Sequence, residues 1–292
     1  MSQNIFSHIG IIGKSNNPEV RSTLASLVEF LREQKLALSL ETECAEILSK
    51  SEKVNSLSKS KLGEQCDLII VVGGDGSFLD AGRAIVDWDK PMVGINRGRL
   101  GFLTDISPQA FQQYLTPILN GEYQAESRFL LDMSIKRNDE TISANCALND
   151  VVLYSGDIAR MIEFEVRVNE QFVYKLRSDG LITATPTGST AYALSGGGPI
   201  LHPALNAMVI VPMHPHTLTS RPIVLDSNDN IELLITSDNT MHPRVSCDGQ
   251  KNFNVQPNDK ICINRKTKTL NILHPNDYDY YHTLRTKLNW NI

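Results

Sequence analysis

The chain contains 292 residues, of which 41% are hydrophobic and 21% are charged, and its formal net charge is −5. No apolar run approaches the roughly 20 residues that a membrane-spanning helix needs. Neither the net charge nor any block of Lys or Arg predicts a nucleic-acid partner. The composition is typical of a globular enzyme whose partners are neither membranes nor nucleic acids.

The amino terminus and the cysteines predict a cytoplasmic protein. The segment MSQNIFSHIG lacks the basic and apolar parts of a secretory signal. The five cysteines are odd in number and form no C-x-x-C pair, which argues against a disulfide framework and a zinc site. His214 and His216 flank a proline with no carboxylate nearby, so we expect a loop there. No residue of the chain is predicted to be a metal ligand.

The first 125 residues alternate strand-like and helix-like patterns. Asn17 and Pro18 suit the N-cap and first position of a helix with one apolar face, and a further capped helix is expected from Ser107-Pro108. This alternation predicts βαβ units and an α/β, Rossmann-like domain over residues 1–125 with a mostly parallel sheet. Strands are expected at residues 8–13, 36–40, 67–72 and 91–96.

After residue 125 the pattern changes to short runs of alternating apolar and polar residues. Asn-Asp and Asn-Glu pairs separate several of these runs, as expected for hairpins. An all-β domain is therefore predicted over residues 126–276. Helical spacing returns in the tail at Tyr281, Leu284 and Leu288, and residues 277–292 are expected to pack back on the first domain.

The stretch LIIVVGGDGSFLDA places Asp75 among glycines, between an apolar strand and an amphipathic helix. Glycines at a strand end let backbone N–H groups approach phosphate oxygens. A carboxylate there repels phosphate unless a divalent cation or a reacting hydroxyl lies between them, which favours phosphoryl transfer. The alternative is that Asp75 caps the helix through its side chain, and the residues alone leave both interpretations open.

Two further segments carry polar groups where a packed core would not. TPTGSTAYALSGGGP, residues 185–199, is rich in hydroxyls and glycines and suits a ribose, an adenine edge or phosphates; the alternative is a turn between strands. ALNDVV, residues 147–152, sets Asn149 and Asp150 among apolar residues. That pair could bind sugar hydroxyls, although the segment taken alone favours a hairpin turn.

With GGDGS, NRGRLGFLTD, ALNDVVL, RSDGLITATPTGSTAYALSGGGP, PMHPHTLTSRPIV and SCDGQ in this order, the sequence resembles bacterial NAD kinases along nearly its whole length. The resemblance implies an N-terminal α/β domain, an all-β C-terminal domain and a dinucleotide between them. It also implies that the adenosine ribose 2′-hydroxyl of NAD attacks the γ-phosphate of ATP. The implied cofactor is a divalent cation, Mg²⁺, carried with the ATP phosphates.

The resemblance assigns roles residue by residue. Asp75 is the implied proton acceptor, Gly73, Gly74 and Gly76 shape the phosphate turn, and Phe102 lines the dinucleotide pocket. At position 150 family members carry Glu, so this carboxylate is one methylene shorter. The remaining implied contacts to the dinucleotide are Asn149, Asp150, Arg160, Arg177, Asp179, Thr187, Thr190, Ala191, Tyr192, Ser195 and Gln250.

The resemblance also implies small-molecule partners, NAD and ATP, and a homo-oligomer, either a dimer or a tetramer. A non-catalytic NAD(P)-binding sensor is one alternative, but its expected mark is a replaced acid in GGDG, and Asp75 is present. A lipid or sugar kinase could share the GGDG turn. The polar loop at 185–199 argues against the apolar acyl tunnel that a lipid kinase needs.

Overall fold

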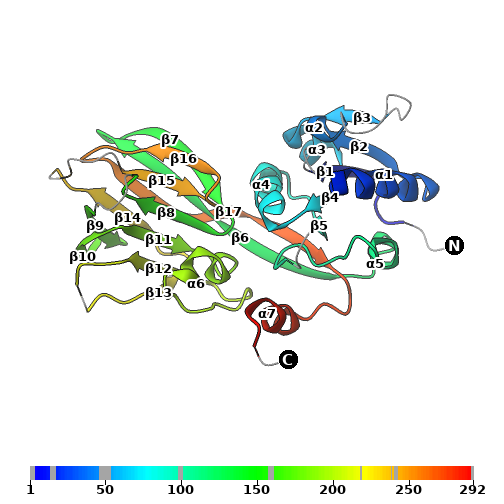
Figure 1. The fold of residues 1–292 in the computed structure, drawn as a ribbon. Coiled ribbons are helices and arrows are strands. Elements are labelled where there is room, and N and C mark those ends of the chain that lie inside the picture. Colours follow the sequence, from blue (N-terminus) through cyan, green and yellow to red (C-terminus); the bar gives the residue numbers. More distant parts are fainter. Residues whose placement is uncertain are drawn as a thin grey trace. The chain divides into compact units, whose positions relative to one another are not determined.

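The computed structural model describes residues 4–13, 18–45, 54–97, 101–156, 161–217, 219–237, 239 and 243–290 (Figure 1). Two compact units make up the chain. Unit 1 contains Met1–Ser127 and Leu270–Ile292, and unit 2 contains Arg128–Thr269. The strands β6 (Gln124–Arg137) and β17 (Lys260–His274) each begin in one unit and end in the other.

A parallel sheet forms the centre of unit 1, with the strand order β17-β5-β4-β1-β2-β3. Every residue of β4 is buried, as expected for a strand that is covered by helices on both faces. The strands that begin and end in this unit have between three and six residues. Their bounds are β1 (His8–Gly13), β2 (Ala37–Glu41), β3 (Asn55–Leu57), β4 (Leu68–Gly73) and β5 (Met92–Asn96).

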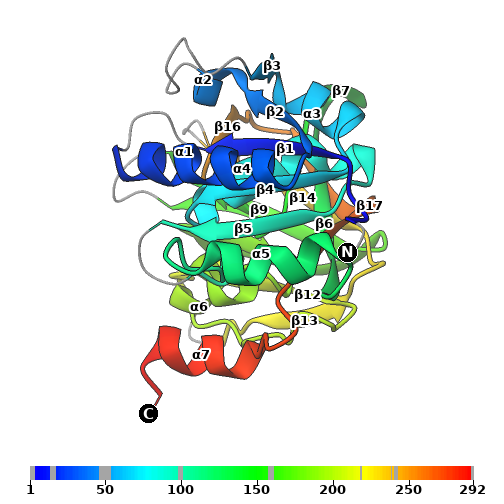
Figure 2. The same cartoon turned by 90° about the vertical axis from the view of Figure 1, so that its right-hand side faces the viewer.

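Helices cover both faces of this sheet (Figure 2). On one face α1 (Pro18–Glu33) and α5 (Phe111–Leu119) share a core in which the rings of Phe30 and Phe111 meet edge to face, 5.7 Å apart. On the other face α3 (Lys59–Gln65) packs against α4 (Asp75–Ile85). Unit 1 also contains α2 (Thr42–Ala45), the 3-10 helix Val86–Trp88 and α7 (Tyr280–Leu288).

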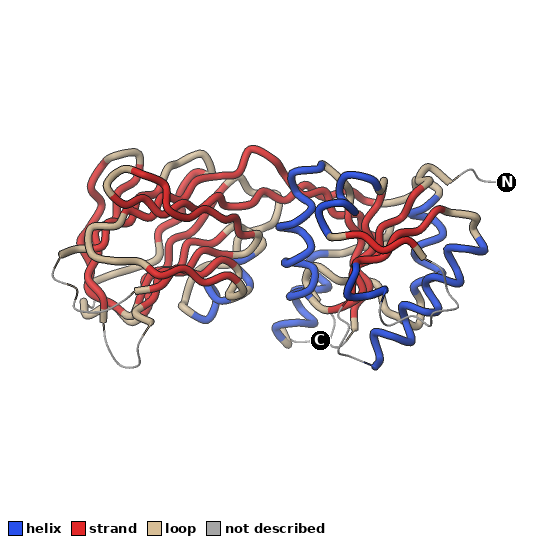
Figure 3. Tube along the Cα trace, turned by 90° about the horizontal axis from the view of Figure 1, so that it is seen from above, coloured by secondary structure: helices blue, strands red, loops and turns tan. Residues whose placement is uncertain are grey.

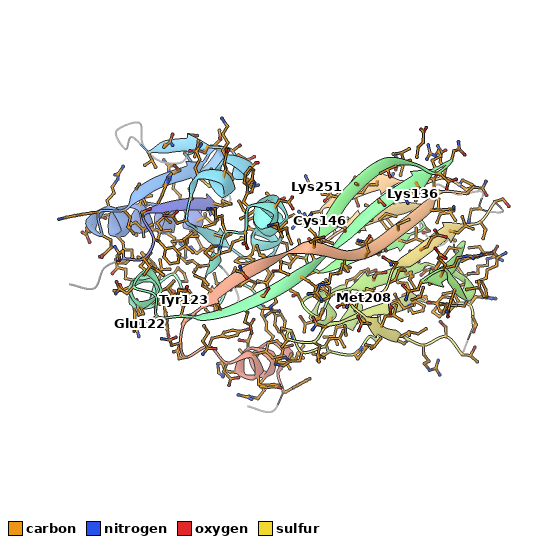
Figure 4. All side chains as sticks on the ribbon, turned by 180° about the vertical axis from the view of Figure 1, so that it is seen from behind. Glu122, Tyr123, Lys136, Cys146, Met208 and Lys251 are labelled. Atoms are coloured by element: carbon orange, nitrogen blue, oxygen red, sulfur yellow. The ribbon has the colours of Figure 1, made fainter. Side chains whose placement is uncertain are left out.

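The start of α5 differs from the prediction. The helix begins at Phe111 rather than at Ser107-Pro108, because the Ser107 carbonyl accepts the Ala110 amide at 3.1 Å and closes a separate turn first. Asn17, the predicted N-cap of α1, lies outside the described residues. After α5, Glu122 and Tyr123 lead into β6 (Figure 4), and Tyr123 packs against the core of unit 1.

Strands and the loops between them make up most of unit 2 (Figure 3), and its strand pairs run antiparallel. One sheet has the order β13-β12-β11-β8-β15-β16; the other strands follow the order β10-β9-β14-β17, with β6 paired to β17 and β7. The 3-10 helix Gly188–Thr190 and α6 (Tyr192–Ser195) follow β11. The strand bounds are β7 (Glu140–Ala147), β8 (Asp150–Tyr154), β9 (Ile162–Val168), β10 (Gln171–Ser178), β11 (Gly180–Ala184), β12 (Ala207–Met213), β13 (Ile223–Asp226), β14 (Ile231–Ile235), β15 (Arg244–Cys247) and β16 (Lys251–Asn254).

The apolar sides of these strands form a core that includes Met208 of β12, and a second apolar cluster includes Ile182 of β11 and Val209 of β12. Two hairpins carry the predicted turn residues. Asn138-Asp139 joins β6 to β7, and Asn169-Glu170 joins β9 to β10; all four residues have positive φ, between 49° and 66°, as two-residue hairpin turns require. The predicted fold class, an α/β domain followed by an all-β domain, is confirmed.

Candidate active site

The polypeptide turns sharply where β4 ends and α4 begins. Gly74 is the N-cap of α4, with an extended backbone (φ −96°, ψ −177°), and as a glycine it has no side chain to cap this helix. The Asp75 carboxylate instead accepts the backbone N–H of Phe102 at 2.8 Å and that of Leu103 at 3.1 Å. The interpretation of Asp75 as a helix cap is therefore wrong. Its carboxylate contacts the loop of residues 101–104, which follows β5.

This loop can hold Asp75 only because residue 101 is a glycine. A Cβ atom on Gly101 would lie 2.0 Å from Asp75 Oδ1 and 2.5 Å from Thr104 Oγ1. The Thr104 hydroxyl donates a third hydrogen bond to the carboxylate, at 3.2 Å. Because an ionised carboxylate has about four acceptor positions, these three donors fix its orientation and leave capacity for one further donor.

The loop is itself attached to β5. The Asn96 side-chain amide donates to the Thr104 carbonyl at 3.0 Å, and Ile106 forms a parallel bridge with Ile95. Thr104 and Ile106 are fully buried. The Asp75 carboxylate therefore lies at the carboxyl ends of neighbouring parallel strands, β4 and β5, which is the edge where α/β sheets bind ligands.

Unit 2 contains a pocket of about 530 Å³, a volume within the range of small-molecule sites. Strand β8, the β11–β12 region and the turn after β15 contribute to its wall. Carboxylate, amide and hydroxyl groups line it together with apolar side chains. Its lining residues are Asn149, Asp150, Val152, Tyr154, Ser155, Asp179, Ala191, Tyr192, Met213, Ser246, Asp248 and Gly249.

Asp248 organises one wall of this pocket. Its carboxylate accepts the backbone N–H groups of Leu148, Asn149 and Asp150, at 3.1, 2.7 and 3.2 Å. The three bonds hold the turn that leads into β8, and so place the side chains of Asn149 and Asp150 on the pocket wall. The role of Asp248 was not predicted. It lies in the SCDGQ segment, where the resemblance implies a contact for Gln250 alone.

Asp150 is buried next to that second carboxylate. Only 4% of its surface is exposed. Burial raises the pKa of Asp150 to about 7, and repulsion from the Asp248 carboxylate adds to the increase. Near neutral pH the side chain therefore exists in both forms and can either donate or accept a hydrogen bond.

The TPTGSTAY segment packs tightly against the same turn. A Cβ atom on Gly188 would lie 2.1 Å from the Asn149 carbonyl oxygen. The Thr185 hydroxyl donates to the Leu148 carbonyl and accepts the Gly188 N–H at 3.1 Å. These contacts bring two segments that are distant in sequence to one site, with Ala191 and Tyr192 on the pocket wall.

Other predicted contact residues lie elsewhere. Thr187 is buried and accepts a bond from the Arg128 guanidinium at 3.1 Å, and the Thr190 hydroxyl donates to the Thr187 carbonyl. Ser195 lines a second pocket of about 310 Å³, which shares Tyr192 and Met213 with the first. Arg177 on β10 and Gln250 after β15 are exposed, and Arg160 lies outside the described residues.

The remaining predicted residues, Gly73, Gly74, Gly76 and Phe102, belong to unit 1 with Asp75. Pocket residues that the sequence did not reveal include Tyr154, Ser155 and Ser246, since alternation along a strand does not show which polar residue faces a cavity. Among the described residues, no group of three His, Cys, Asp or Glu side chains could hold a metal ion, and no helix is long and apolar enough to span a membrane.

Comparisons with known proteins agree over both units. Residues 9–123 match the ATP-NAD kinase N-terminal domain, and residues 148–274 match the ATP-NAD kinase C-terminal domain. The chain is 49% identical over 286 residues to an NAD kinase of Marinomonas sp. (strain MWYL1), covering 98% of this chain and 97% of that protein. It is 50% identical over 285 residues to an NAD kinase of Pseudomonas entomophila (strain L48), covering 98% and 96%.

Two solved structures are similar to this one. The crystal structure of yeast NADH kinase complexed with NADH has a TM-score of 0.91 at 23% identity, covering 99% of this chain and 89% of that chain. An NAD kinase from Archaeoglobus fulgidus in complex with ATP has a TM-score of 0.73 at 25% identity, covering 96% and 99%. The first likeness, at its low identity, concerns the fold alone.

Proposed function

The chain belongs to the ATP-NAD kinase family, and we propose that it transfers the γ-phosphate of ATP to the 2′-hydroxyl of the adenosine ribose of NAD. The 2′ O–H bond breaks, a bond forms between that oxygen and the γ-phosphorus, and ADP leaves. The products are NADP and ADP. The observation that carries this proposal is the unit 2 pocket, in which an amide, carboxylates and an exposed aromatic ring converge.

The chemistry of this pocket suits a nucleoside. The Tyr192 ring is 47% exposed and lines the pocket, so it can stack on a flat base. Asn149 and Asp150 offer an amide and a carboxylate, which can pair with ribose hydroxyls. Three hydrogen bonds to Asp248 fix the backbone of this turn. The pocket wall is therefore ordered before the sugar binds, and binding does not carry the entropy cost of ordering it.

Asp75 is the residue that we propose for the chemical step. Phosphoryl transfer has a loose transition state, so catalysis depends mainly on positioning and charge neutralisation. A carboxylate with three donors around it is held rigidly and keeps one acceptor position for a hydroxyl. Asp75 therefore orients the attacking 2′-hydroxyl and accepts its proton. Mg²⁺ is part of the substrate, bound to the phosphates of ATP.

We also propose a cytoplasmic, homo-oligomeric enzyme, a dimer or a tetramer. None of the five cysteines, all of which lie in the described part of the chain, forms a disulfide, as is usual in a reducing compartment. Edge strand β10 exposes Phe172, at 57%, and Val173, and β13 at the edge of the other sheet exposes Val224, at 49%. These apolar groups would suit contacts between copies. Light scattering on the purified protein measures the assembly state directly.

The purified protein should form NADP when it is incubated with NAD, ATP and Mg²⁺. In Asp75→Asn we expect turnover to fall by about 10²–10⁴-fold, the usual contribution of a general base, because the amide cannot accept a proton. NAD binding, measured by calorimetry, should remain. Asp277→Asn alters an exposed acid of the same unit and serves as the control. Turnover in Asp75→Asn within a few-fold of the parent would refute the role of this residue.

A further inference from the structure

A buried histidine lies behind the loop that holds Asp75. His274 is the last residue of β17 and is fully buried within unit 1. Its Nδ1 atom lies 2.8 Å from Asp105 Oδ2, and its Nε2 atom lies 3.4 Å from Glu126 Oε2. The ring also stacks on Tyr278, at 3.9 Å between ring centres and 11° between planes. One imidazole thus faces two carboxylates and one tyrosine.

The charge of this histidine is set by its neighbours. Burial lowers the pKa of His274, but hydrogen bonding and charge attraction to Asp105 and Glu126 outweigh burial, and the net direction is upward. The two carboxylates therefore favour the charged imidazolium over the neutral ring. An imidazolium donates from both nitrogens, whereas a neutral imidazole donates from only one. Nδ1 is within hydrogen-bonding distance of Asp105, whereas Nε2 lies at ion-pair distance from Glu126 without a hydrogen bond, so loss of the proton would remove the charge attraction to both carboxylates.

Asp105 connects this histidine to the candidate active site. It directly follows Thr104, whose hydroxyl donates to Asp75, and it precedes Ile106, which bridges to β5. The side chain of Asp105 is 9% exposed. Its second oxygen, Oδ1, is buried and has no hydrogen-bond partner among the described residues. The bond to His274 is therefore the contact that compensates the buried Asp105 carboxylate.

We propose that His274 is a positioning residue for the phosphoryl transfer. By pairing with Asp105, the charged imidazole fixes the segment 104–106, and through it the amides of Phe102 and Leu103 that orient the Asp75 carboxylate. The effect reaches Asp75 through the loop, since no contact joins His274 to Asp75 among the described residues. This inference rests on the proposed function, and it predicts that turnover depends on the protonation of His274.

The test replaces His274 by glutamine, which keeps a donor but cannot carry the charge. We expect kcat of His274→Gln to fall by about 10- to 100-fold, the usual cost of misplacing a catalytic group, with KM for NAD and ATP little changed. In the parent, kcat should decline as the pH rises through the pKa of His274. That alkaline decline should be absent in His274→Gln. His8→Gln is the matched control, because His8 is a half-buried histidine of the same sheet, at the start of β1.

Hydrogen exchange provides a readout that does not depend on activity. The amides of Phe102 and Leu103 should exchange at least several-fold faster in His274→Gln than in the parent, and at the parent rate in His8→Gln. Asp105→Asn removes the charge of the other partner. It should likewise lower kcat and speed the exchange of the Phe102 and Leu103 amides. If His274→Gln folds poorly, Asp105→Asn still tests whether the pair orients the loop. A merely structural histidine would lower the unfolding temperature without altering the pH profile of kcat.

The outcomes separate this inference from the proposed function. If the parent makes no NADP, the proposed function is wrong, and the exchange of Phe102 and Leu103 still tests the positioning by His274. If the parent is active, but both variants keep kcat within two-fold and retain the alkaline decline, the inference is overturned. Unchanged exchange at the two amides in both variants also overturns it.

Discussion

Ionisation of the buried Asp150 carboxylate, which lines the unit 2 pocket, should reduce the free energy of unfolding of unit 2. Its pKa is raised to about 7, first by burial and then by repulsion from Asp248. In the unfolded chain an aspartate ionises near its ordinary value, 3.8. The unfolded state therefore loses this proton at lower pH than the folded state does. Below about pH 4 Asp150 is protonated in both states and does not lower the free energy of unfolding. As the pH rises from there to about 7, the free energy of unfolding falls progressively.

The magnitude follows from the two ionisation equilibria. Each tenfold difference between them corresponds to 1.36 kcal/mol, so the displacement from 3.8 to about 7 amounts to about 4 kcal/mol. Asp150→Asn keeps the shape of the side chain and removes both the charge and the repulsion. We expect this variant to become more stable relative to the parent by about 2.5 kcal/mol between pH 5 and pH 7.5, with little further change above that range.

The assay is urea unfolding of both proteins at several pH values, followed by far-ultraviolet circular dichroism. Tryptophan fluorescence would follow the unfolding of unit 1 rather than that of unit 2, since both tryptophans, Trp88 and Trp290, belong to unit 1. Glu140→Gln, at an exposed position of β7 in unit 2, is the control. A stability difference between Asp150→Asn and the parent that stays constant from pH 5 to pH 7.5 would refute this assignment. The stabilised variant should bind NAD more weakly, as expected when a strained group is kept for function.

Two glycines carry further predictions. In Gly101→Ala the new Cβ would meet Asp75 Oδ1 at 2.0 Å, so kcat should fall by about 100-fold while calorimetry still detects NAD binding. In Gly188→Ala the new Cβ would meet the Asn149 carbonyl at 2.1 Å. The turn into β8 must then shift, so we expect unit 2 to lose about 1–3 kcal/mol of stability in urea and NAD to bind more weakly. Parent-like values in these assays would contradict the close packing.

Local patterns were sufficient for much of the fold. The apolar run before Gly73 predicted a buried strand, and β4 is buried at every residue. The pairs Asn138-Asp139 and Asn169-Glu170 predicted hairpins, because asparagine and its neighbours tolerate positive φ in two-residue turns. The start of α5 was predicted too early. Ser107 and the residue after it suit a helix start and a turn equally, and only the packing of the following apolar residues distinguishes them.

The candidate site was less accessible to sequence reasoning. The pattern around Asp75 indicated a strand, a turn and a helix, but the partners of its carboxylate lie 27 to 29 residues further along the chain. Asp248 holds a turn that lies about a hundred residues before it, and no local pattern encodes that distance. For Thr187 the resemblance implied a contact with the dinucleotide. In the structure its hydroxyl oxygen accepts a hydrogen bond from Arg128.

The His274 cluster brings together three residues of unit 1, Asp105, Glu126 and His274, that are far apart in the sequence. Glu126 lies near the beginning of β6 and His274 at the end of β17, the two strands along which the chain passes between the units. Asp105 belongs to the loop that orients Asp75. A single imidazole ring therefore ties the unit 1 ends of both crossing strands to the loop behind the proposed catalytic carboxylate. Any change that displaces either strand end would act on the Asp105 pair, and so on the orientation of Asp75, without touching a substrate.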